Sequence, residues 1–253
     1  MSTSENINNN EVVVKAENVR KSFNGTVVID DVSFELRKKE NLAIMGRSGS
    51  GKSVLIKNIV GLLVPNKGSL KVLGKEVKNL DEDEMVELRR SVGYLFQGGA
   101  LYDSMTVERN LKFPLRRLPG KPSEAEVNDR VDEMLENVGL LDAKQKYPEE
   151  LSGGMKKRIA LARTLVLKPE IMLYDEPTTG LDVITSNEIS ELILEMREKY
   201  AISSIIITHD IACVEKTTDK VMILKDGNVL TENSYDNLAN SEDYEIRSYF
   251  KVN

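Results

Sequence analysis

Short runs of consecutive apolar residues recur along the chain, and each has the length of one buried strand. These runs cover residues 42–45, 171–174, 204–208 and 221–224. Between them, apolar residues recur every three or four positions, which predicts helices over roughly 124–140, 153–167 and 183–200. Strands that alternate with helices pair in parallel through right-handed crossovers, so the pattern predicts an α/β fold whose sheet is covered on both faces.

The amino-terminal part follows a different pattern. Residues 12–23 and 27–36 form two β-rich runs, and the Asn-Gly pair at 24–25 is a hairpin signal because both residues tolerate positive φ. The Asp-Gly pair at 226–227 is a second such signal, after the last apolar run. The sequence therefore predicts antiparallel hairpins beside the parallel strands.

Composition distinguishes the remaining segments. Residues 1–10 are polar and rich in asparagine, which predicts a disordered N-terminus. The stretch 98–163 is mostly helical in pattern and is interpreted as a helical insertion. Residues 241–253 mix aromatic and charged side chains, so they are either a frayed end or a docking strip for a partner.

Charge and cysteine content narrow the class of protein. The 253 residues include 35 Lys and Arg against 41 Asp and Glu, a formal charge of −6. Phosphate contacts need an excess of cations, so no nucleic-acid partner is expected. The single cysteine, Cys213, excludes an internal disulfide, and no apolar run approaches the ~20 residues of a membrane span. We expect a cytoplasmic protein that serves a membrane only through a partner.

The strongest chemical signal is a glycine-rich segment directly after the apolar run 42–45. It has the P-loop pattern G-x-x-x-x-G-K-S, and apolar residues at helical spacing follow until Pro65, which is expected to close that helix. Glycines let successive N–H groups turn onto phosphate oxygens, the lysine neutralises them, and the serine hydroxyl is a Mg²⁺ ligand. The segment predicts nucleoside triphosphate binding by Gly46, Arg47, Ser48, Gly49, Ser50, Gly51, Lys52 and Ser53.

Three further polar residues follow buried strands. Asp175 and Glu176 come after 171–174, and His209 comes after 204–208. The carboxyl ends of parallel strands converge on one crevice, so all three are expected beside the P-loop. Asp175 is assigned to a water on Mg²⁺, Glu176 to the general base, and His209 to the γ-phosphate and the attacking water. Taken alone, the carboxylates fit a solvated strand end and the histidine a structural role, but the P-loop on the same sheet favours chemistry.

A second anion site is indicated at the start of the helical pattern 153–167. Ser152 followed by Gly153 and Gly154 presents free backbone N–H groups to an anion. One chain has no second triphosphate for this tip. We therefore interpret it as a cap on the γ-phosphate held by another protomer.

These motifs, in this order, resemble those of the ABC ATPases from about residue 11 to 245. The resemblance rests on the P-loop, Gln97, the signature Leu151–Met155, Asp175-Glu176, Gly180-Leu181-Asp182 and His209. It implies a P-loop NTPase of the ABC type, with a parallel core sheet, an N-terminal antiparallel β-subdomain and an inserted helical subdomain at about 98–163. Residues 246–253 would form a C-terminal tail.

The same resemblance implies how the chain works. Two ATP molecules would lie between P-loop and signature in a head-to-tail homodimer. Mg²⁺ would be held by Ser53, Gln97 and, through water, Asp175, with Gln97 also reporting to the membrane partner. Phe23 matches the aromatic that stacks on adenine, although a hairpin-core role is equally open from the residues alone. Asp182 looks like the residue that communicates across the dimer.

Finer features are similar to the Mla/Mce-type lipid-transport ATPases. They are the Gly-Gly-Ala-Leu-Tyr-Asp-Ser string at 98–104, Met155 and Val54, whereas Val183 departs from the usual proline. This implies phospholipid transport between inner and outer membranes, powered from the cytoplasmic face of the inner membrane. The implied partners are an integral-membrane permease, a small STAS-like regulatory subunit and a periplasmic lipid-binding Mce-type protein. Tyr102, Met105 and Phe113 are either permease contacts or core residues.

Two other functions stay open. The chain could serve another ABC system, such as a solute importer or a lipoprotein- or division-linked complex. A soluble ABC ATPase acting on DNA, ribosomes or cluster assembly would need a coiled-coil insertion, a duplicated domain or a basic face, none of which the sequence shows. The basic residues Lys156, Lys157, Arg158 and Arg163 are interpreted as a solvated helix face.

Overall fold

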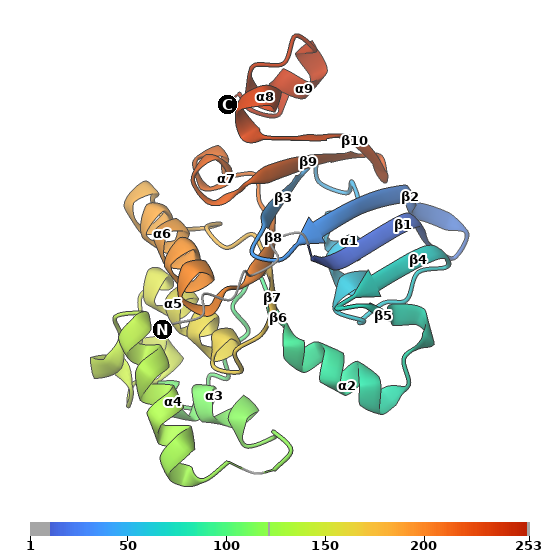
Figure 1. Ribbon diagram of the computed structural model, residues 1–253. Helices are drawn as coiled ribbons and strands as arrows, with labels where there is room; N and C mark the ends of the chain where they lie inside the picture. The colour runs from blue at the N-terminus through green and yellow to red at the C-terminus, as the bar shows by residue number, and fades with distance from the viewer. Residues whose placement is uncertain (1–10, 121, 252–253) are drawn as a thin grey trace, which may run out of the picture.

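The framework of the protein is a six-stranded sheet in the order β10-β9-β3-β8-β7-β6 (Figure 1). The computed structural model describes residues 11–120 and 122–251, so the predicted disorder of residues 1–10 lies outside it. Strands β9, β3, β8, β7 and β6 pair in parallel, and β10 pairs antiparallel with β9. The strands are β3 (Asn41–Met45), β6 (Val92–Leu95), β7 (Ile171–Asp175), β8 (Ser203–Ile207), β9 (Lys220–Lys225) and β10 (Asn228–Asn233).

A separate antiparallel sheet has the order β2-β1-β4-β5. The predicted turn joins β1 to β2, with φ of 48° at Asn24 and 83° at Gly25, and a turn of this kind matches the twist of the strands. Asp226 and Gly227, at φ of 48° and 80°, join β9 to β10 in the same way. The sequence did not predict β4 and β5. The strands are β1 (Val12–Phe23), β2 (Thr26–Arg37), β4 (Lys67–Val72) and β5 (Lys75–Glu76).

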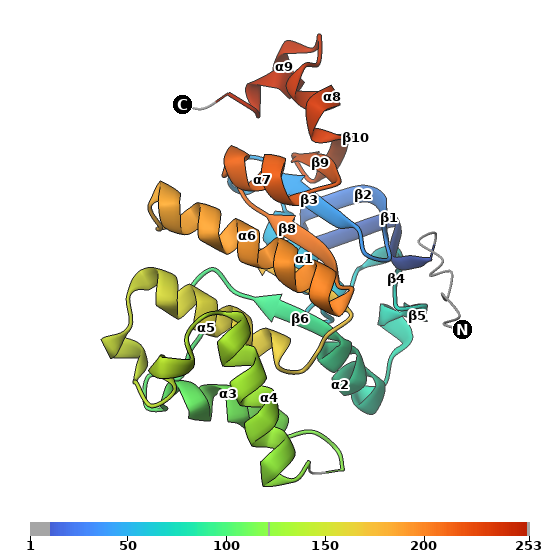
Figure 2. The same ribbon diagram turned by 60° about the vertical axis from the view of Figure 1, so that its left-hand side comes forward.

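Helices connect the strands (Figures 1 and 2). Helices α3 and α4 lie at one end of the molecule and α8 and α9 at the opposite end. No helix in residues 11–120 or 122–251 combines the length and apolarity that a bilayer span requires. The helices are α1 (Lys52–Ile59), α2 (Glu82–Ser91), α3 (Val107–Leu115), α4 (Glu124–Asn137), α5 (Gly153–Leu165), α6 (Val183–Tyr200), α7 (Ile211–Thr217), α8 (Tyr235–Ala239) and α9 (Tyr244–Ser248), with 3₁₀ turns η1 (Val77–Asn79), η2 (Leu141–Ala143) and η3 (Pro148–Glu150).

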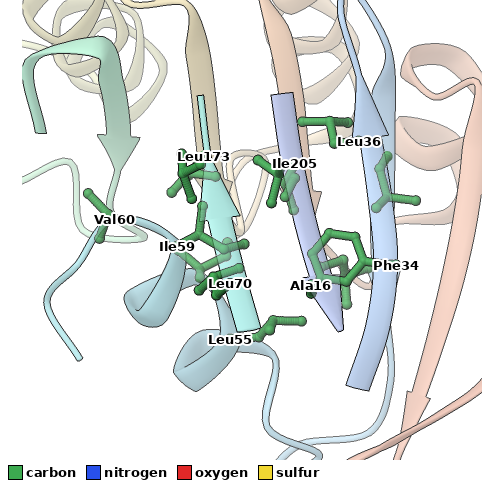
Figure 3. Packing of buried hydrophobic residues seen from close by; sticks show 14 of the residues in the cluster. Ala16, Phe34, Leu36, Leu55, Ile59, Val60, Leu70, Leu173 and Ile205 are labelled. Atoms are coloured by element: carbon green, nitrogen blue, oxygen red, sulfur yellow. The ribbon is translucent and has the colours of Figure 1, made fainter. Parts of the chain in front are cut away.

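Both faces of the central sheet are buried, which explains its unbroken apolar runs. On β7, Ile171 and Leu173 pack with α1 and the antiparallel sheet, whereas Met172 and Tyr174 pack with helices α3 to α6. Figure 3 shows the first layer, in which α1 and the two sheets contribute side chains to one cluster. This burial on two sides fixes the strands that carry the polar residues at their ends.

The helix after the P-loop is shorter than predicted. Helix α1 ends at Ile59, and Gly61 follows at φ 69°. A glycine in the left-handed region is a frequent helix terminator, since it lacks a Cβ that would clash there. Gly61 rather than Pro65 therefore ends this helix. The prediction that Leu62 continues its apolar face is wrong, because that side chain is 49% exposed.

The C-terminal segment is packed, so the prediction of a frayed end is wrong for residues 241–251. Its apolar side chains contact a cluster built from β3, β9 and α8. Phe250 meets Tyr235 edge-on with ring centroids 5.4 Å apart, and Lys225 pairs with Glu245 at 2.5 Å. Helix α9 also crosses the boundary that was placed between residues 245 and 246.

Cys213 lies on α7 with only 1% of its surface exposed. Its sulfur is 4.0 Å from Thr217 Oγ1. Burial raises the pKa of the thiol, because the thiolate is disfavoured away from water. The side chain is therefore held in its protonated, poorly nucleophilic form.

Ile205 on β8 tests the core, because it is fully buried between the two sheets. We expect Ile205→Ala to lower the free energy of unfolding by about 2–5 kcal/mol, from lost burial and the cavity left behind. Val86→Ala on α2 is the control, since Val86 is 45% exposed. Urea denaturation followed by circular dichroism measures both, and equal effects of the two substitutions would contradict the described core.

Candidate nucleotide site

The P-loop joins the end of β3 to the start of α1. Gly49 and Gly51 have φ of 81° and 104°, and a Cβ on Gly51 would lie 2.8 Å from the carbonyl oxygen of Val28. Only glycine fits this close approach. The turn ends at Lys52, the first residue of α1, where free N–H groups and the helix dipole favour an anion.

A cavity of about 510 Å³ opens over this turn, a size suited to a small-molecule ligand. Inside it, Ser50 Oγ is buried without a hydrogen-bond partner, an unmet polar group that a phosphate oxygen would satisfy. The cavity brings together most of the predicted site. Its lining residues are Val28, Gly46, Ser48, Gly49, Ser50, Gly51, Lys52, Ser53, Val54, Gln97, Asp175, Glu176, Ile207 and His209.

Lys52 is tied to the turn that it follows. Its ammonium donates to the carbonyl oxygens of Gly46 at 2.7 Å and Arg47 at 3.0 Å. Burial lowers the pKa of Lys52, while attraction to Glu176 and Asp175 opposes that effect. A cation that lines the same cavity as the P-loop turn is suited to phosphate oxygens.

Glu176 is oriented by several hydrogen bonds. Its φ is 53°, and its N–H donates to the carbonyl oxygen of Ile207 at 2.8 Å. Thr179 Oγ1 donates to Glu176 Oε2 at 2.9 Å, and His209 Nδ1 lies 2.9 Å from the same oxygen. The His209 side chain is 74% exposed, so the pair faces the open side of the cavity.

Asp175 has a partner that sequence reasoning missed. The Tyr94 hydroxyl donates to Asp175 Oδ2 at 3.0 Å. Burial raises the pKa of Tyr94, and the Asp175 charge adds to this effect, so the phenol stays a donor. Thr179 was missed as well. Tyr94 could be found only from the register of β6 against β7, which pairs it with Leu173.

The lining fits the expected Mg²⁺ through oxygen ligands. No cluster of three or more His, Cys, Asp or Glu side chains suited to a metal occurs in the described part of the chain. Ser53, Gln97 and Asp175 nevertheless share the cavity, and hydroxyl, amide and carboxylate oxygens are ligands that Mg²⁺ prefers. The remaining positions of an octahedral ion would be filled by phosphate and water oxygens.

Several predicted site residues lie outside this cavity. Phe23 is 40% exposed at the β1–β2 hairpin, so its alternative role as hairpin core is wrong. Ser152 and Asp182 cap α5 and α6, where they accept from the N–H groups of Met155 and Thr185. Hydrogen bonds to Thr185 lower the pKa of Asp182. Gly153 and Gly154 follow Ser152, while Arg47 lines neighbouring hollows beside the P-loop.

The prediction of a solvated basic face on α5 is wrong for three of its four residues. Lys157 donates to the carbonyl oxygens of Gln97 and Glu176, at 2.5 Å and 3.2 Å. Arg158 pairs with Glu188 at 2.7 Å, and Arg163 donates to the carbonyl oxygen of Ala100. Lys156 alone among the four is exposed. The sequence could not reveal this, because the acceptors belong to distant segments.

Comparison with known proteins decides the family. The profile described as ABC transporter matches residues 29–179, which is more than half of the chain. The chain belongs to the ABC transporter ATP-binding family. The predicted fold class is thereby confirmed.

Solved structures agree with this fold. A dimeric ATP-binding cassette in a post-hydrolysis state, bound to ADP and Pi, aligns with a TM-score of 0.80 and 32% identity, covering 87% of this chain and 98% of that one. CbiO1 of Clostridium perfringens, part of the ABC transporter complex cbiONQ, gives a TM-score of 0.84 and 32% identity, covering 94% of each chain.

Curated relatives carry several different names. The methionine import ATP-binding protein MetN of Carboxydothermus hydrogenoformans is 42% identical over 81% of this chain and 60% of its own length. MetN of Campylobacter jejuni is 38% identical, over 89% and 72%. Trigalactosyldiacylglycerol 3 of Arabidopsis thaliana is 37% identical, over 88% and 69%. The methionine importers do not support the predicted phospholipid cargo, nor do these names support STAS-like or Mce-type partners.

Gly51→Ala tests the P-loop geometry. The added Cβ is strained at positive φ and also clashes with the carbonyl oxygen of Val28. We therefore expect a lower free energy of unfolding and weaker ATP binding. Gly74→Ala is the matched control, because Gly74 has φ 75° with no atom within 4 Å of its Cβ. It should cost only the left-handed strain of about 1–2 kcal/mol and leave ATP affinity unchanged. Denaturation and titration with a fluorescent ATP analogue measure both, and identical losses would refute the close approach.

Proposed function

We propose that this chain is the ATP-hydrolysing subunit of an ABC transporter. The observation that carries the proposal is the pairing of Glu176 with His209 in the cavity that also holds Lys52 and the P-loop turn. A general base must lie within hydrogen-bond reach of the water it activates, and the open face of this cavity gives a water that access. The chain would work as a peripheral protein on the cytoplasmic face of the membrane.

Each residue has a defined part in this mechanism. The P-loop N–H groups and Lys52 bind the β- and γ-phosphates, and Mg²⁺, when bound, neutralises charge that develops on them. Glu176 polarises the attacking water, while Thr179 holds the carboxylate in place. His209 steadies that water and the γ-phosphate from the exposed side. The P-loop and Glu176 line the same cavity, so a water there can reach both the carboxylate and the bound phosphates.

A second protomer completes the site in this proposal. The Ser152–Gly154 tip and Asp182 are exposed helix starts that do not line the P-loop cavity of their own chain. A head-to-tail homodimer would place the tip of one protomer over the γ-phosphate of the other, where the N-terminus of α5 favours the anion. The dimeric cassette among the structural neighbours supports this arrangement. Phe23, at the exposed hairpin, would stack on adenine.

The transmembrane partner would dock near Gln97. Tyr102 is 39% exposed. Its ring centroid lies 4.7 Å from that of Phe113 and 4.9 Å from Cζ of Arg163. Met105 and Phe113 are half-buried, so they combine core packing with a surface contact. An aromatic and cationic patch of this kind is typical of interface hot spots.

The cargo has two candidates. The MetN relatives favour a small polar solute that is imported, and this is the first candidate. Phospholipid is the second, favoured by the 98–104 string beside Gln97 and by a relative named after a glycolipid. Overall sequence identity does not distinguish the two cargo candidates, because the three relatives are 42%, 38% and 37% identical to this chain. Most of that identity reflects the ATPase residues that they share. STAS-like and Mce-type partners belong to the second candidate.

Glu176→Gln tests the assignment of the base. The amide keeps the shape of the side chain but loses its basicity, so ATP turnover should fall by at least roughly 10²-fold while ATP binding persists. Phosphate release and titration with a fluorescent ATP analogue measure the two quantities.

The same variant tests the homodimer, because slow hydrolysis traps the closed state. With ATP and Mg²⁺ it should elute as a dimer in light-scattering chromatography, whereas without nucleotide it should not. Wild-type turnover would refute the base, and a strictly monomeric ATP-loaded variant would refute the shared site.

Purification of the whole complex from membranes distinguishes the cargo. If the complex is a solute importer, a solute-binding protein loaded with its amino acid should raise its rate of ATP hydrolysis several-fold. No phospholipid should then co-purify specifically with it. A lipid transporter should retain phospholipid, detected by mass spectrometry, and respond to lipid instead. Recovery without any membrane protein would contradict the transport function and favour a soluble ATPase.

A further inference from the structure

Lys157 joins three segments that lie far apart in the sequence. It stands on α5 little more than one helical turn after Ser152. Its Nζ donates to the carbonyl oxygen of Gln97 at 2.5 Å and to that of Glu176 at 3.2 Å. Both acceptors are main-chain atoms, so the contact fixes the path of the backbone rather than a side-chain rotamer.

One of these carbonyls belongs to a strained residue. Glu176 has φ 53°, a left-handed conformation that is unfavourable for a residue with a Cβ. Its N–H is held by Ile207 at the end of β8. Lys157 holds the opposite side of the same residue, and the carboxylate is then aimed by Thr179 and His209. The Glu176 carbonyl oxygen also accepts from the N–H of Thr179 at 3.4 Å, so without Lys157 it would keep only this longer bond among those described.

The other carbonyl belongs to Gln97, two residues after the end of β6. Gln97 follows this strand and is exposed, so its position depends on contacts such as the 2.5 Å bond from Lys157. Lys157 is half-buried and its ammonium turns onto two carbonyl oxygens, whereas a lysine stem usually carries the ammonium into water. Its neighbour Lys156 is exposed and shows the usual behaviour.

We infer that Lys157 is a positioning residue for ATP hydrolysis, through which the Ser152–Gly154 tip, Gln97 and the Glu176 carboxylate move together. The inference rests on the proposed function. If α5 shifted as a unit by about 1 Å away from these acceptors, the 2.5 Å bond to Gln97 would reach the limit of about 3.5 Å, and the 3.2 Å bond to Glu176 would break. A misplacement of about 1 Å at a catalytic group can cost roughly 10²-fold in rate.

Lys157→Met tests this inference, because it keeps the length of the stem and removes the donors. We expect kcat for ATP to fall roughly ten- to a hundredfold, with KM changed less than about twofold, since the phosphate-binding turn is untouched. Hydrogen exchange over residues 96–101 and 175–180 should become faster, with a melting temperature close to that of the wild type. Lys156→Met is the matched control and should change none of these, and Lys157→Arg, which keeps donors, should recover part of kcat.

Two results would overturn the inference. One is a Lys157→Met protein with wild-type kcat and unchanged exchange in both segments. The other is a parallel loss of kcat, KM and melting temperature, which a general packing role predicts. If the wild-type chain itself has no ATP turnover, the proposed function fails, and the exchange data alone decide: faster exchange in both segments supports the positioning contact, and unchanged exchange refutes it.

Discussion

The parallel register of β3, β8 and β7 is the constraint on which the site depends. Ile207 pairs with Ile44 on one side and with Asp175 on the other, so the three strands end level with one another. Burial of both faces holds this register, because a slip of one residue would turn each side chain to the opposite layer. The P-loop, the carboxylate pair and the histidine meet only because these ends coincide.

Strain at the site is balanced by contacts from outside it. Glu176 adopts positive φ at the point where β7 ends, and fixed donors and acceptors on several sides keep it there. Such a conformation persists when the surroundings determine it more strongly than the local preference of the residue. The position of the Glu176 carboxylate is therefore set by three strands and helix α5 together, rather than by the Asp-Glu pair alone.

The sequence predicted those parts of the molecule whose signals are local. The apolar runs predicted β7, β8 and β9, and the Asn-Gly and Asp-Gly pairs predicted two turns. The spacing of the glycines and the lysine predicted the P-loop. The predicted helix after the P-loop is longer than α1, because the chain leaves the helix at Gly61 although apolar residues continue at helical spacing beyond it. Strands β4 and β5 were not predicted, because β4 pairs with β1, which is distant in sequence, and β5 is a two-residue strand that pairs with β4.

The residues that support the site could not be predicted for a related reason. Tyr94 reaches Asp175 through sheet register, and Lys157 reaches Glu176 across a helix-to-strand contact. In both cases the partner lies far away in the sequence, so the local pattern around Tyr94 or Lys157 does not indicate the contact. The C-terminal segment shows the same limit, because its mixed composition hides the edge-on contact of Phe250 with Tyr235.

The burial of Cys213 has a practical consequence. A thiol that is 1% exposed, with its pKa raised, reacts poorly with maleimides and other alkylating reagents. A cysteine introduced at an exposed position such as Val183 or Tyr244, which are 76% and 68% exposed, would become the reactive thiol of the chain. One spectroscopic label could thus be attached at a chosen position without removing the native cysteine.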